Sequence, residues 1–421
     1  MTMIRNGGLG VLIGAAVGTL FLVPANSLAQ QEVFRVDPCS LTSIFYATML
    51  AAVSGCAAEG NAPDQHTLGV MYANGIDVVE DNVEAVRWFR MAAEQGHAAA
   101  QHDLGLMYAE GDGVIEDDME AVRWYRLAAE QGYVPAHGNL GVMYDNGYGV
   151  PEDDAEALRW YRLAAEERFA PAQYNLGVMY DNGYGVPEDD VEALRWYRLA
   201  AEQRSAPAQY NLGVKHDNGD GVPEDIKEAL RWYRLSAEQG FPAAQYNLGV
   251  MYDNGNGVPS DDGEAVRWYQ LAAEQEHVMA QFTLGMMYSQ GEGVPRDESK
   301  AIHWYRLAAE QGDALAQTNL GVTYAQRWYR YELEVEAVPG DTLAEVNLGL
   351  VQQDLVLAFM WFTLSAAQGN ETAQRNKGVI EEWLTREQVS EAQRLSQEWI
   401  ERHAQEGIEP TETIRMPDRR R

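Results

Sequence analysis

Residues 170–205 read APAQYNLGVMYDNGYGVPEDDVEALRWYRLAAEQRS, and versions of this stretch recur along most of the 421-residue chain. The dipeptide Leu-Gly and a tryptophan both return at intervals of 36 residues. The leucines are Leu68, Leu104, Leu140, Leu176, Leu212, Leu248, Leu284 and Leu320, and the tryptophans are Trp88, Trp124, Trp160, Trp196, Trp232, Trp268 and Trp304. A fixed period in this range is typical of a solenoid, in which one supersecondary unit is stacked in tandem.

Each unit is predicted to contain a helix, a glycine loop and a second helix. Leu176 and Tyr180 lie four residues apart on an apolar stripe of the first helix. The loop at 182–185 ends this helix, because glycine reaches the left-handed conformations that reverse the chain. Asp189 followed by Glu192 resembles a capping box and predicts the start of the second helix.

Small and bulky residues alternate on the predicted helices. A glycine inside a helix costs about 1 kcal/mol relative to alanine, so the recurrence of Gly177 in every copy requires a packing reason. Trp196 and Tyr197 stand beside small residues of the second helix, which predicts interdigitating packing. Arg195 lies on the other side, where it can pair with Glu192.

The pattern A-x-x-x-L-G-x-x-Y-x-x-G-x-G-V-x-x-D-x-x-E-A-x-x-W-Y-x-x-A-A-E-Q-G resembles the Sel1-like repeat, a relative of the tetratricopeptide repeat. The match covers roughly residues 62–324, with weaker copies outside this range. The resemblance implies an all-α fold, an α/α right-handed superhelical solenoid whose first helices line the concave face. It also implies adaptor proteins, often of secretory or periplasmic compartments. We therefore expect about nine helix-loop-helix repeats and a C-terminal capping helix.

The regular pattern breaks towards the C-terminus. No glycine loop follows Tyr324, and the next Leu-Gly, at Leu348, comes sooner after Leu320 than the regular period would place it. Thr385 and Gln388 form a capping box before a long polar helix that would close the array. The expected organisation is a signal peptide at 1–29, an N-terminal segment and opening half-repeat at 30–61, seven regular repeats at 62–313, degenerate repeats with a shortened-loop seam at 314–370, capping helices at 371–407 and a flexible tail at 408–421.

The first residues resemble a secretory signal. Arg5 supplies the positive region, residues 9–23 are apolar, and small residues end at Ala29, where we expect cleavage. This predicts a periplasmic or secreted protein with no stable membrane insertion after cleavage; a retained anchor is the alternative. A lipoprotein-like box at 53–56 is an alternative signal, although its alignment with the end of a repeat favours an opening half-repeat.

Cys39 and Cys56 are the only cysteines, and an oxidising compartment favours their pairing. A continuous helix from Ser40 to Glu59 would instead hold the sulfur atoms roughly 25 Å apart. Since a disulfide requires Cα atoms within about 7 Å, a bridge would require this helix to break.

The formal charge of −33, from 64 acidic and 31 basic residues, excludes nucleic acid as a natural partner and gives no support for binding an anionic membrane. It permits a basic protein partner. A strongly charged surface also keeps a long, tyrosine-rich array soluble, so the charge alone does not identify a partner.

The residues that carry chemistry do not form a recognisable catalytic or metal motif. The acidic loop at 181–190 suggests calcium, but glycines and a tyrosine occupy the places of EF-hand ligands. His66 and His102 hold equivalent positions one repeat apart, which is too few ligands for a metal site. We therefore expect no metal, no cofactor and no catalysis, with a calcium-stiffened structural spacer as one alternative.

An enzymatic alternative comes from the resemblance. A cysteine-rich branch of the Sel1-like family is associated with β-lactam hydrolysis, which suggests a β-lactam or cell-wall-related hydrolase. The paired cysteines of that branch are absent from these repeats, as are Ser-x-x-Lys, Ser-Asp-Asn and Lys-Thr-Gly.

The favoured hypothesis is a scaffold, adaptor or regulator that binds an unidentified protein or peptide on its concave face. Residues beside the apolar stripe of the first helices would stack into rows, and tyrosine and asparagine suit the recognition of an extended peptide. The alternative is that these rows only reflect recent duplication. The candidate binding residues are Tyr174, Asn175, Tyr210, Asn211, Tyr246, Asn247, Asp145, Asp181, Asp217 and Asp253.

Overall fold

The computed structural model describes residues 53–337 and 342–405, and all regular secondary structure in these ranges is α-helical. The expected signal peptide at 1–29, Cys39 and the tail at 408–421 lie outside the described residues. The helices are α2 (Ala62–Asn74), α3 (Asn82–Glu94), α4 (Ala98–Glu110), α5 (Asp118–Glu130), α6 (Val134–Asn146), α7 (Asp154–Glu166), α8 (Ala170–Asn182), α9 (Asp190–Glu202), α10 (Ala206–Asn218), α11 (Ile226–Glu238), α12 (Pro242–Asn254), α13 (Asp262–Ala273), α14 (Val278–Gln290), α15 (Glu298–Glu310), α16 (Ala314–Ala337), α17 (Thr342–Ala367), α18 (Glu371–Glu381) and α19 (Arg386–Gln405).

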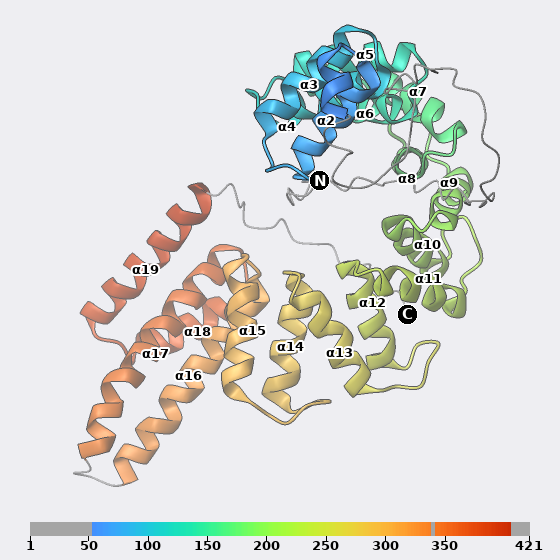
Figure 1. Ribbon diagram of the computed structural model, residues 1–421. Coiled ribbons are helices and arrows are strands. Elements are labelled where there is room, and N and C mark those ends of the chain that lie inside the picture. The colour runs from blue at the N-terminus through green and yellow to red at the C-terminus, as the bar shows by residue number, and fades with distance from the viewer. Residues whose placement is uncertain (1–52, 338–341, 406–421) are drawn as a thin grey trace, which may run out of the picture.

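The array is a curved stack of helix pairs, in which each helix packs on its neighbours in sequence (Figure 1). The even-numbered helices from α2 to α14 are the first helices of the repeats, and the odd-numbered helices from α3 to α15 are the second. Figure 1 shows α8 and α12 nearer the inside of the curve than α9 and α13. The first helices α6 and α8 also touch each other directly. The all-helical repeat solenoid is therefore confirmed, with first helices on its inner side.

The helix ends follow the sequence signals. Gly183 ends α8 in the left-handed region, with φ of 74°, and its N–H donates to the carbonyl oxygen of Met179. Asp189 caps α9, because its side chain accepts hydrogen bonds from the backbone N–H groups of Val191 and Glu192 at 3.0 Å each. The expected ion pair also forms, since Arg195 donates to Glu192 at 3.0 Å.

The recurring glycine inside each first helix has the packing reason that its cost requires. A Cβ atom at Gly177 would lie 2.6 Å from two ring carbons of Tyr197, so the ring occupies the space of the missing side chain. The equivalent glycine and second-helix tyrosine make the same contact at Gly105–Tyr125, Gly141–Tyr161, Gly213–Tyr233, Gly249–Tyr269 and Gly285–Tyr305.

Each hydrophobic core crosses a repeat boundary. Tyr161 of α7, Leu176 and Met179 of α8 and Trp196 of α9 belong to one such cluster. A polar ladder accompanies these cores: buried Gln173 donates to the carbonyl oxygen of Ala165 in the preceding repeat at 3.1 Å and accepts from Gln203 at 2.7 Å. One repeat therefore completes the core and the hydrogen bonds of the next.

The seam at 314–370 differs from the predicted shortened loop. Gly321 of α16 packs on Phe362 of α17, as Gly285 packs on Tyr305, but about twice as much chain separates the two members of this pair. Because no glycine ends the first helix, α16 continues to Ala337, and the extra chain forms a long helical hairpin with α17 (Figure 1). The segment is thus one expanded repeat.

The C-terminal helices close the array as predicted. The capping box of α19 is reciprocal: the N–H of Thr385 donates to Gln388 Oε1 at 2.9 Å, and the N–H of Gln388 donates to Thr385 Oγ1 at 3.3 Å. Buried His403 lies with its Nε2 atom 2.6 Å from the carbonyl oxygen of Glu310, at the end of α15. One hydrophobic cluster begins at Phe282 of α14 and runs through α15, α16, α17, α18 and α19.

The N-terminal edge supports the half-repeat interpretation of residues 53–59. Val53 and Ala57 pack on Leu68 of α2, and Gln65 donates to the carbonyl oxygen of Ala57 at 3.0 Å, as in the regular boundaries. Cys56 is disulfide-bonded, which is the paired alternative that the sequence left open. None of the helices in the described part of the chain is both long and apolar enough to cross a membrane.

Candidate protein-interaction surface

The predicted tyrosine row lies on the first helices α8, α10 and α12, where each ring is partly buried. Tyr174 packs on Tyr197 of the adjoining second helix, with ring centroids 6.0 Å apart. Tyr246 packs on Tyr269 in the same way and also stacks on His277, at 4.9 Å and an interplanar angle of 26°. Burial raises the pKa of the Tyr174 hydroxyl. These rings are therefore packed against neighbouring side chains and remain partly exposed.

The predicted asparagine row hydrogen-bonds within the protein. Asn211 bonds to the hydroxyl groups of Tyr174 and Tyr197, which both belong to the preceding repeat. Equivalent bonds join Asn247 to Tyr210 and Tyr233, and Asn175 to Tyr161. The amides that were expected to meet a peptide backbone therefore help to hold consecutive repeats in register.

The predicted aspartate row is also engaged internally. Burial raises the pKa of Asp145 and of Asp217, and a hydrogen bond from a tyrosine hydroxyl opposes the shift in both. Asp145, Asp181, Asp217 and Asp253 accept these bonds from Tyr161, Tyr197, Tyr233 and Tyr269 at 3.2, 3.1, 3.3 and 3.3 Å. All ten candidate residues thus lie on the first helices from α6 to α12, but most of their polar groups bond to tyrosines of the protein itself.

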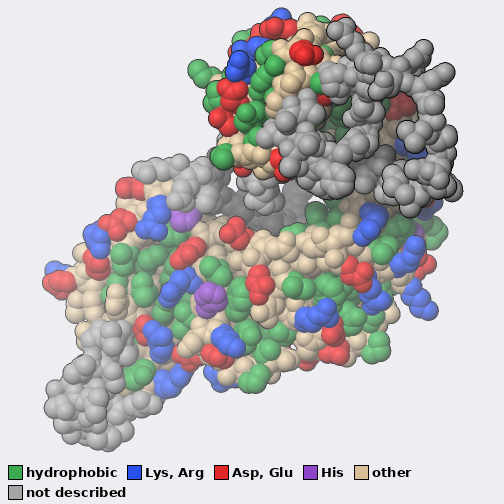
Figure 2. Space-filling model, in the orientation of Figure 1, with side chains coloured by type: hydrophobic (Ala, Val, Ile, Leu, Met, Phe, Trp, Pro, Cys, Tyr) green, Lys and Arg blue, Asp and Glu red, His purple; other side chains and the backbone are tan. Residues whose placement is uncertain are grey.

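The outer surface carries paired charges. Arg195 lies over the ring of Trp196, 4.9 Å from its centroid, while its guanidinium pairs with Glu192. The same arrangement recurs on the other second helices from α3 to α13. Figure 2 shows Lys and Arg interspersed with Asp and Glu on the visible face, with no large area of a single charge. This pattern is typical of a solvated surface.

Comparison with known proteins supports the sequence pattern. A model of the Sel1 repeat matches residues 63–97, 98–133, 134–168, 170–205, 206–241, 242–277, 278–313 and 345–370. The chain belongs to the Sel1 repeat family. Sel1 repeat proteins generally act as protein-interaction scaffolds, and the fold is typically non-enzymatic.

Two solved structures give the scale of the similarity. A protective antigen of uropathogenic Escherichia coli strains, which displays an SLR fold, is 30% identical, with a TM-score of 0.50, over 88% of this chain and 99% of that chain. A Sel1 repeat protein from Oxalobacter formigenes is 33% identical, with a TM-score of 0.53, over 58% of this chain and 96% of that chain. None of the curated proteins matches the chain.

The first two repeats of this Sel1 protein replace the tyrosine–asparagine ladder by histidine and aspartate. Asp103 stands where later repeats carry asparagine, and its carboxylate lies 2.7 Å from His66 Nε2 and 2.8 Å from His102 Nδ1. Burial alone would raise the pKa of Asp103, but hydrogen bonds from both histidines outweigh this effect and lower it to about 2. The repeat period predicted that His66 and His102 lie near each other. It did not predict that Asp103 bridges them.

A second departure from the Sel1 pattern is Lys215 of α10, a buried lysine at a position that is methionine in the other first helices from α2 to α14. Its ammonium group lies between Asp181 of α8 and Asp190 of α9. Burial would lower the pKa of Lys215, but the hydrogen bonds to both carboxylates outweigh this effect and raise it. In the part of the chain that the structure describes, no group of three or more His, Cys, Asp or Glu is arranged to hold a metal ion.

Proposed function

We propose that this Sel1 repeat protein is an extracytoplasmic adaptor or regulator that binds a protein or peptide along the inner side of its first helices. The observation that carries the proposal is a strip in which a partly exposed tyrosine is followed, one helical turn later, by a partly exposed valine. The strip consists of Tyr174 and Val178 on α8, Tyr210 and Val214 on α10, and Tyr246 and Val250 on α12.

The strip suits binding because its aromatic rings are already ordered. Tyr210 is held between Tyr233 and Phe241, at 5.9 and 5.3 Å between ring centroids. A side chain that is fixed before binding loses little rotamer entropy on association, and tyrosine is enriched in binding hot spots. In this proposal the asparagine and aspartate rows position the rings, and the partner contacts ring edges and valine methyl groups.

The extracytoplasmic location rests on the signal-like N-terminus. Fractionated cells of the source organism, with the N-terminus of the chain determined by mass spectrometry, would test it. We expect a chain that begins at Gln30 in the envelope fraction. An uncut chain in the cytosolic fraction would contradict this part of the proposal.

The binding surface is tested by crosslinking and affinity capture from the native envelope, with bound proteins identified by mass spectrometry. Alanine at the tyrosines would remove a ring that packs on α9, α11 and α13, so the informative variant carries Val178→Lys, Val214→Lys and Val250→Lys. These valines also pack partly on the cores, so a parent-like melting temperature must show that the variant is folded before capture is compared. Three added charges on the strip should abolish capture of a specific partner, because each ammonium group would have to be desolvated on binding.

The matched control carries three lysines on the second helices, at Val83→Lys, Met119→Lys and Val191→Lys. These side chains are exposed, and Lys227 is the natural residue at the equivalent position of α11. The control should capture the same partner as the parent. Equal capture by both variants would place the site elsewhere, and no specific capture by the parent would contradict the scaffold proposal.

A further inference from the structure

The tenth residue of each first helix from α2 to α14 carries a long unbranched side chain that is buried, and we call the space it fills the slot. Lys215 reveals the walls of the slot, because its Nζ atom lies 2.6 Å from Asp190 Oδ1 and also pairs with Asp181. These partners are the first residue of the preceding second helix and the twelfth residue of the preceding first helix. In the other first helices from α2 to α14 a buried methionine holds this position, at Met71, Met107, Met143, Met179, Met251 and Met287.

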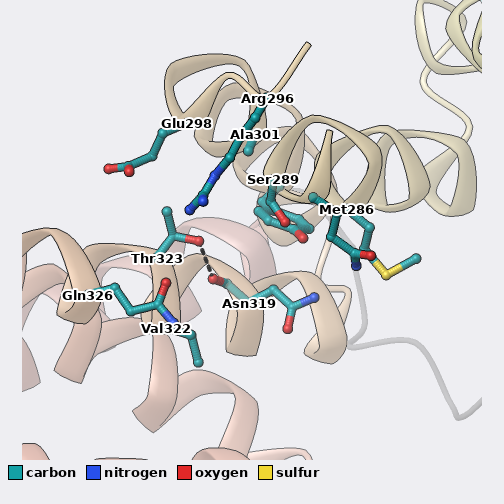
Figure 3. A pocket seen from close by; sticks show the side chains of 11 residues that line it. Met286, Ser289, Arg296, Glu298, Ala301, Asn319, Val322, Thr323 and Gln326 are labelled. Carbon is teal, nitrogen blue, oxygen red and sulfur yellow. Dashed lines mark hydrogen bonds between the residues drawn. The ribbon is translucent and has the colours of Figure 1, made fainter. Parts of the chain in front are cut away.

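The slot is empty at the seam. Thr323, Ser289 and Glu298 stand three repeat periods after Lys215, Asp181 and Asp190. A cavity of about 230 Å³ lies here between α14, α15 and α16, and these three residues line it (Figure 3). Thr323 is shorter than methionine, and its hydroxyl donates to the carbonyl oxygen of Asn319 at 2.8 Å instead of reaching across. The space that a side chain of the array fills elsewhere is therefore available to another molecule.

The charge of the empty slot is inverted. Arg296 stands where the equivalent residue three repeats earlier is Glu188, and Ser289 replaces Asp181. Figure 3 shows the Arg296 side chain pointing into the cavity. Glu298 is neutralised by Arg330, at 2.7 Å, whereas Arg296 makes no ion pair with any residue that the structure describes. A slot that holds a cation at Lys215 therefore offers an unpaired cation at the seam.

The remaining walls suit a side chain with an apolar stem and a polar end. Met286 and Val322 form an apolar side, and the amide of Gln326 also lines the cavity, whereas the amide of Asn319 bonds to Tyr305. We infer that this cavity binds the carboxylate of a linear side chain, such as a glutamate presented by a partner. A guanidinium recognises a carboxylate strongly in proteins, because it can donate two parallel charge-assisted N–H bonds. The inference deepens the proposed function, on which it rests for the source of the carboxylate.

The purified mature chain allows a direct test that does not require the natural partner. Methionine methyl groups are labelled with ¹³C, the Met286 signal is assigned with Met286→Leu, and three probes are titrated: Ac-Gly-Gly-Glu-Gly-Gly-NH2, its glutamine counterpart and free glutarate. We expect a saturable shift of the Met286 signal with the glutamate peptide and at least about tenfold weaker binding of the glutamine peptide, because a charge-assisted hydrogen bond is lost. Tighter binding of glutarate than of the glutamate peptide would assign the cavity to small dicarboxylic acids. It would contradict the inference that the carboxylate belongs to a partner protein.

Two variants restore residues that the array itself uses and should therefore fold. Thr323→Met refills the slot, and Arg296→Glu restores the usual charge; each should weaken the glutamate peptide at least about tenfold. Lys300→Glu on α15 makes the same change of charge outside the cavity lining and should leave binding within about twofold of the parent. Three results would overturn the inference. They are binding of the glutamate peptide to Thr323→Met as tightly as to the parent, equal binding of the glutamate and glutamine peptides, and no saturable shift with any probe. If Thr323→Met still captures a partner from the envelope and the triple valine-to-lysine variant does not, the proposed binding strip is supported and the carboxylate site is not.

Discussion

The ammonium group of Lys215 lies 2.6 Å from a carboxylate oxygen of Asp190, inside a boundary that methionine fills in the neighbouring repeats. Replacing a buried charge by an apolar residue of similar length is often neutral or stabilising, whereas truncation leaves a cavity and unpaired carboxylates. We expect Lys215→Met to leave the free energy of unfolding unchanged or raise it by about 1–2 kcal/mol. Lys215→Ala should lower it by about 2–4 kcal/mol in urea titrations. Equal destabilisation by both variants would show that the ion pair itself is required.

The contact between Gly177 and the Tyr197 ring predicts opposite effects of alanine at two helical glycines. Gly177→Ala should destabilise by about 1–3 kcal/mol, because the added methyl group overlaps the ring and overpacking outweighs the gain in helix propensity. Gly378 is exposed in α18 and a Cβ atom there meets nothing within 4 Å, so Gly378→Ala should stabilise by about 0.5–1 kcal/mol. Thermal melting of both variants would compare them; stabilisation by Gly177→Ala would contradict the packing role.

Arg204 adopts a left-handed conformation, with φ of 66°, at a position where Gly240 follows one repeat later. This conformation costs a residue with a Cβ atom about 1–2 kcal/mol. Arg204→Gly should therefore stabilise the protein by about 1 kcal/mol after the extra entropy of glycine is subtracted. The reverse change, Gly240→Arg, should destabilise by a similar amount. Urea midpoints that move in the opposite directions would show that the turn is not strained.

Asp103 predicts a specific acid sensitivity of the first two repeats. Its pKa of about 2 in the folded protein is below the ordinary value of an aspartate, so its contribution is fully present above about pH 4 and is lost as the pH falls towards 2. The shift corresponds to about 2 kcal/mol. Asp103→Asn, which restores the residue of the later repeats, should remove this part of the pH dependence.

The measurement is the free energy of unfolding between pH 2 and 6 for the parent and Asp103→Asn. The parent should lose more stability than the variant over this range, and the two curves should converge near pH 2. Parallel curves would indicate that the bonds to His66 and His102 do not stabilise the charged form.

The sequence predicted the local features of this protein more completely than the contacts between repeats. The Asp189 cap, the Gly183 turn and the ion pair of Arg195 depend on residues within a few positions of one another, and all three form as expected. The bond from Asn211 back to Tyr174 depends instead on the stagger of consecutive repeats, which the period alone does not give. The sequence therefore predicted that tyrosine, asparagine and aspartate form rows on the first helices. It could not predict whether their polar groups point to solvent or to the neighbouring repeat.

The seam illustrates the same limit. The missing glycine loop after Tyr324 was visible in the sequence, but a short connection and a long helical hairpin are both compatible with its absence. The pairing of Gly321 with Phe362 decides between them, and it is a contact between positions far apart in the chain. Asp103 was accessible from the sequence, because it is an acid in a column of asparagines, and a position-by-position comparison of the copies would have found it.

The division of the interior into small clusters has a mechanical consequence. In the regular repeats each cluster joins only neighbouring helices. The curvature of the array can therefore change through small shifts between helices at many repeat boundaries. A single larger core, which begins at Phe282 of α14, joins the helices from α14 to α19, and this continuity should make that end stiffer. Under the proposed function, a partner that does not match the curve would be accommodated by small changes at these repeat boundaries, while the C-terminal end keeps its shape.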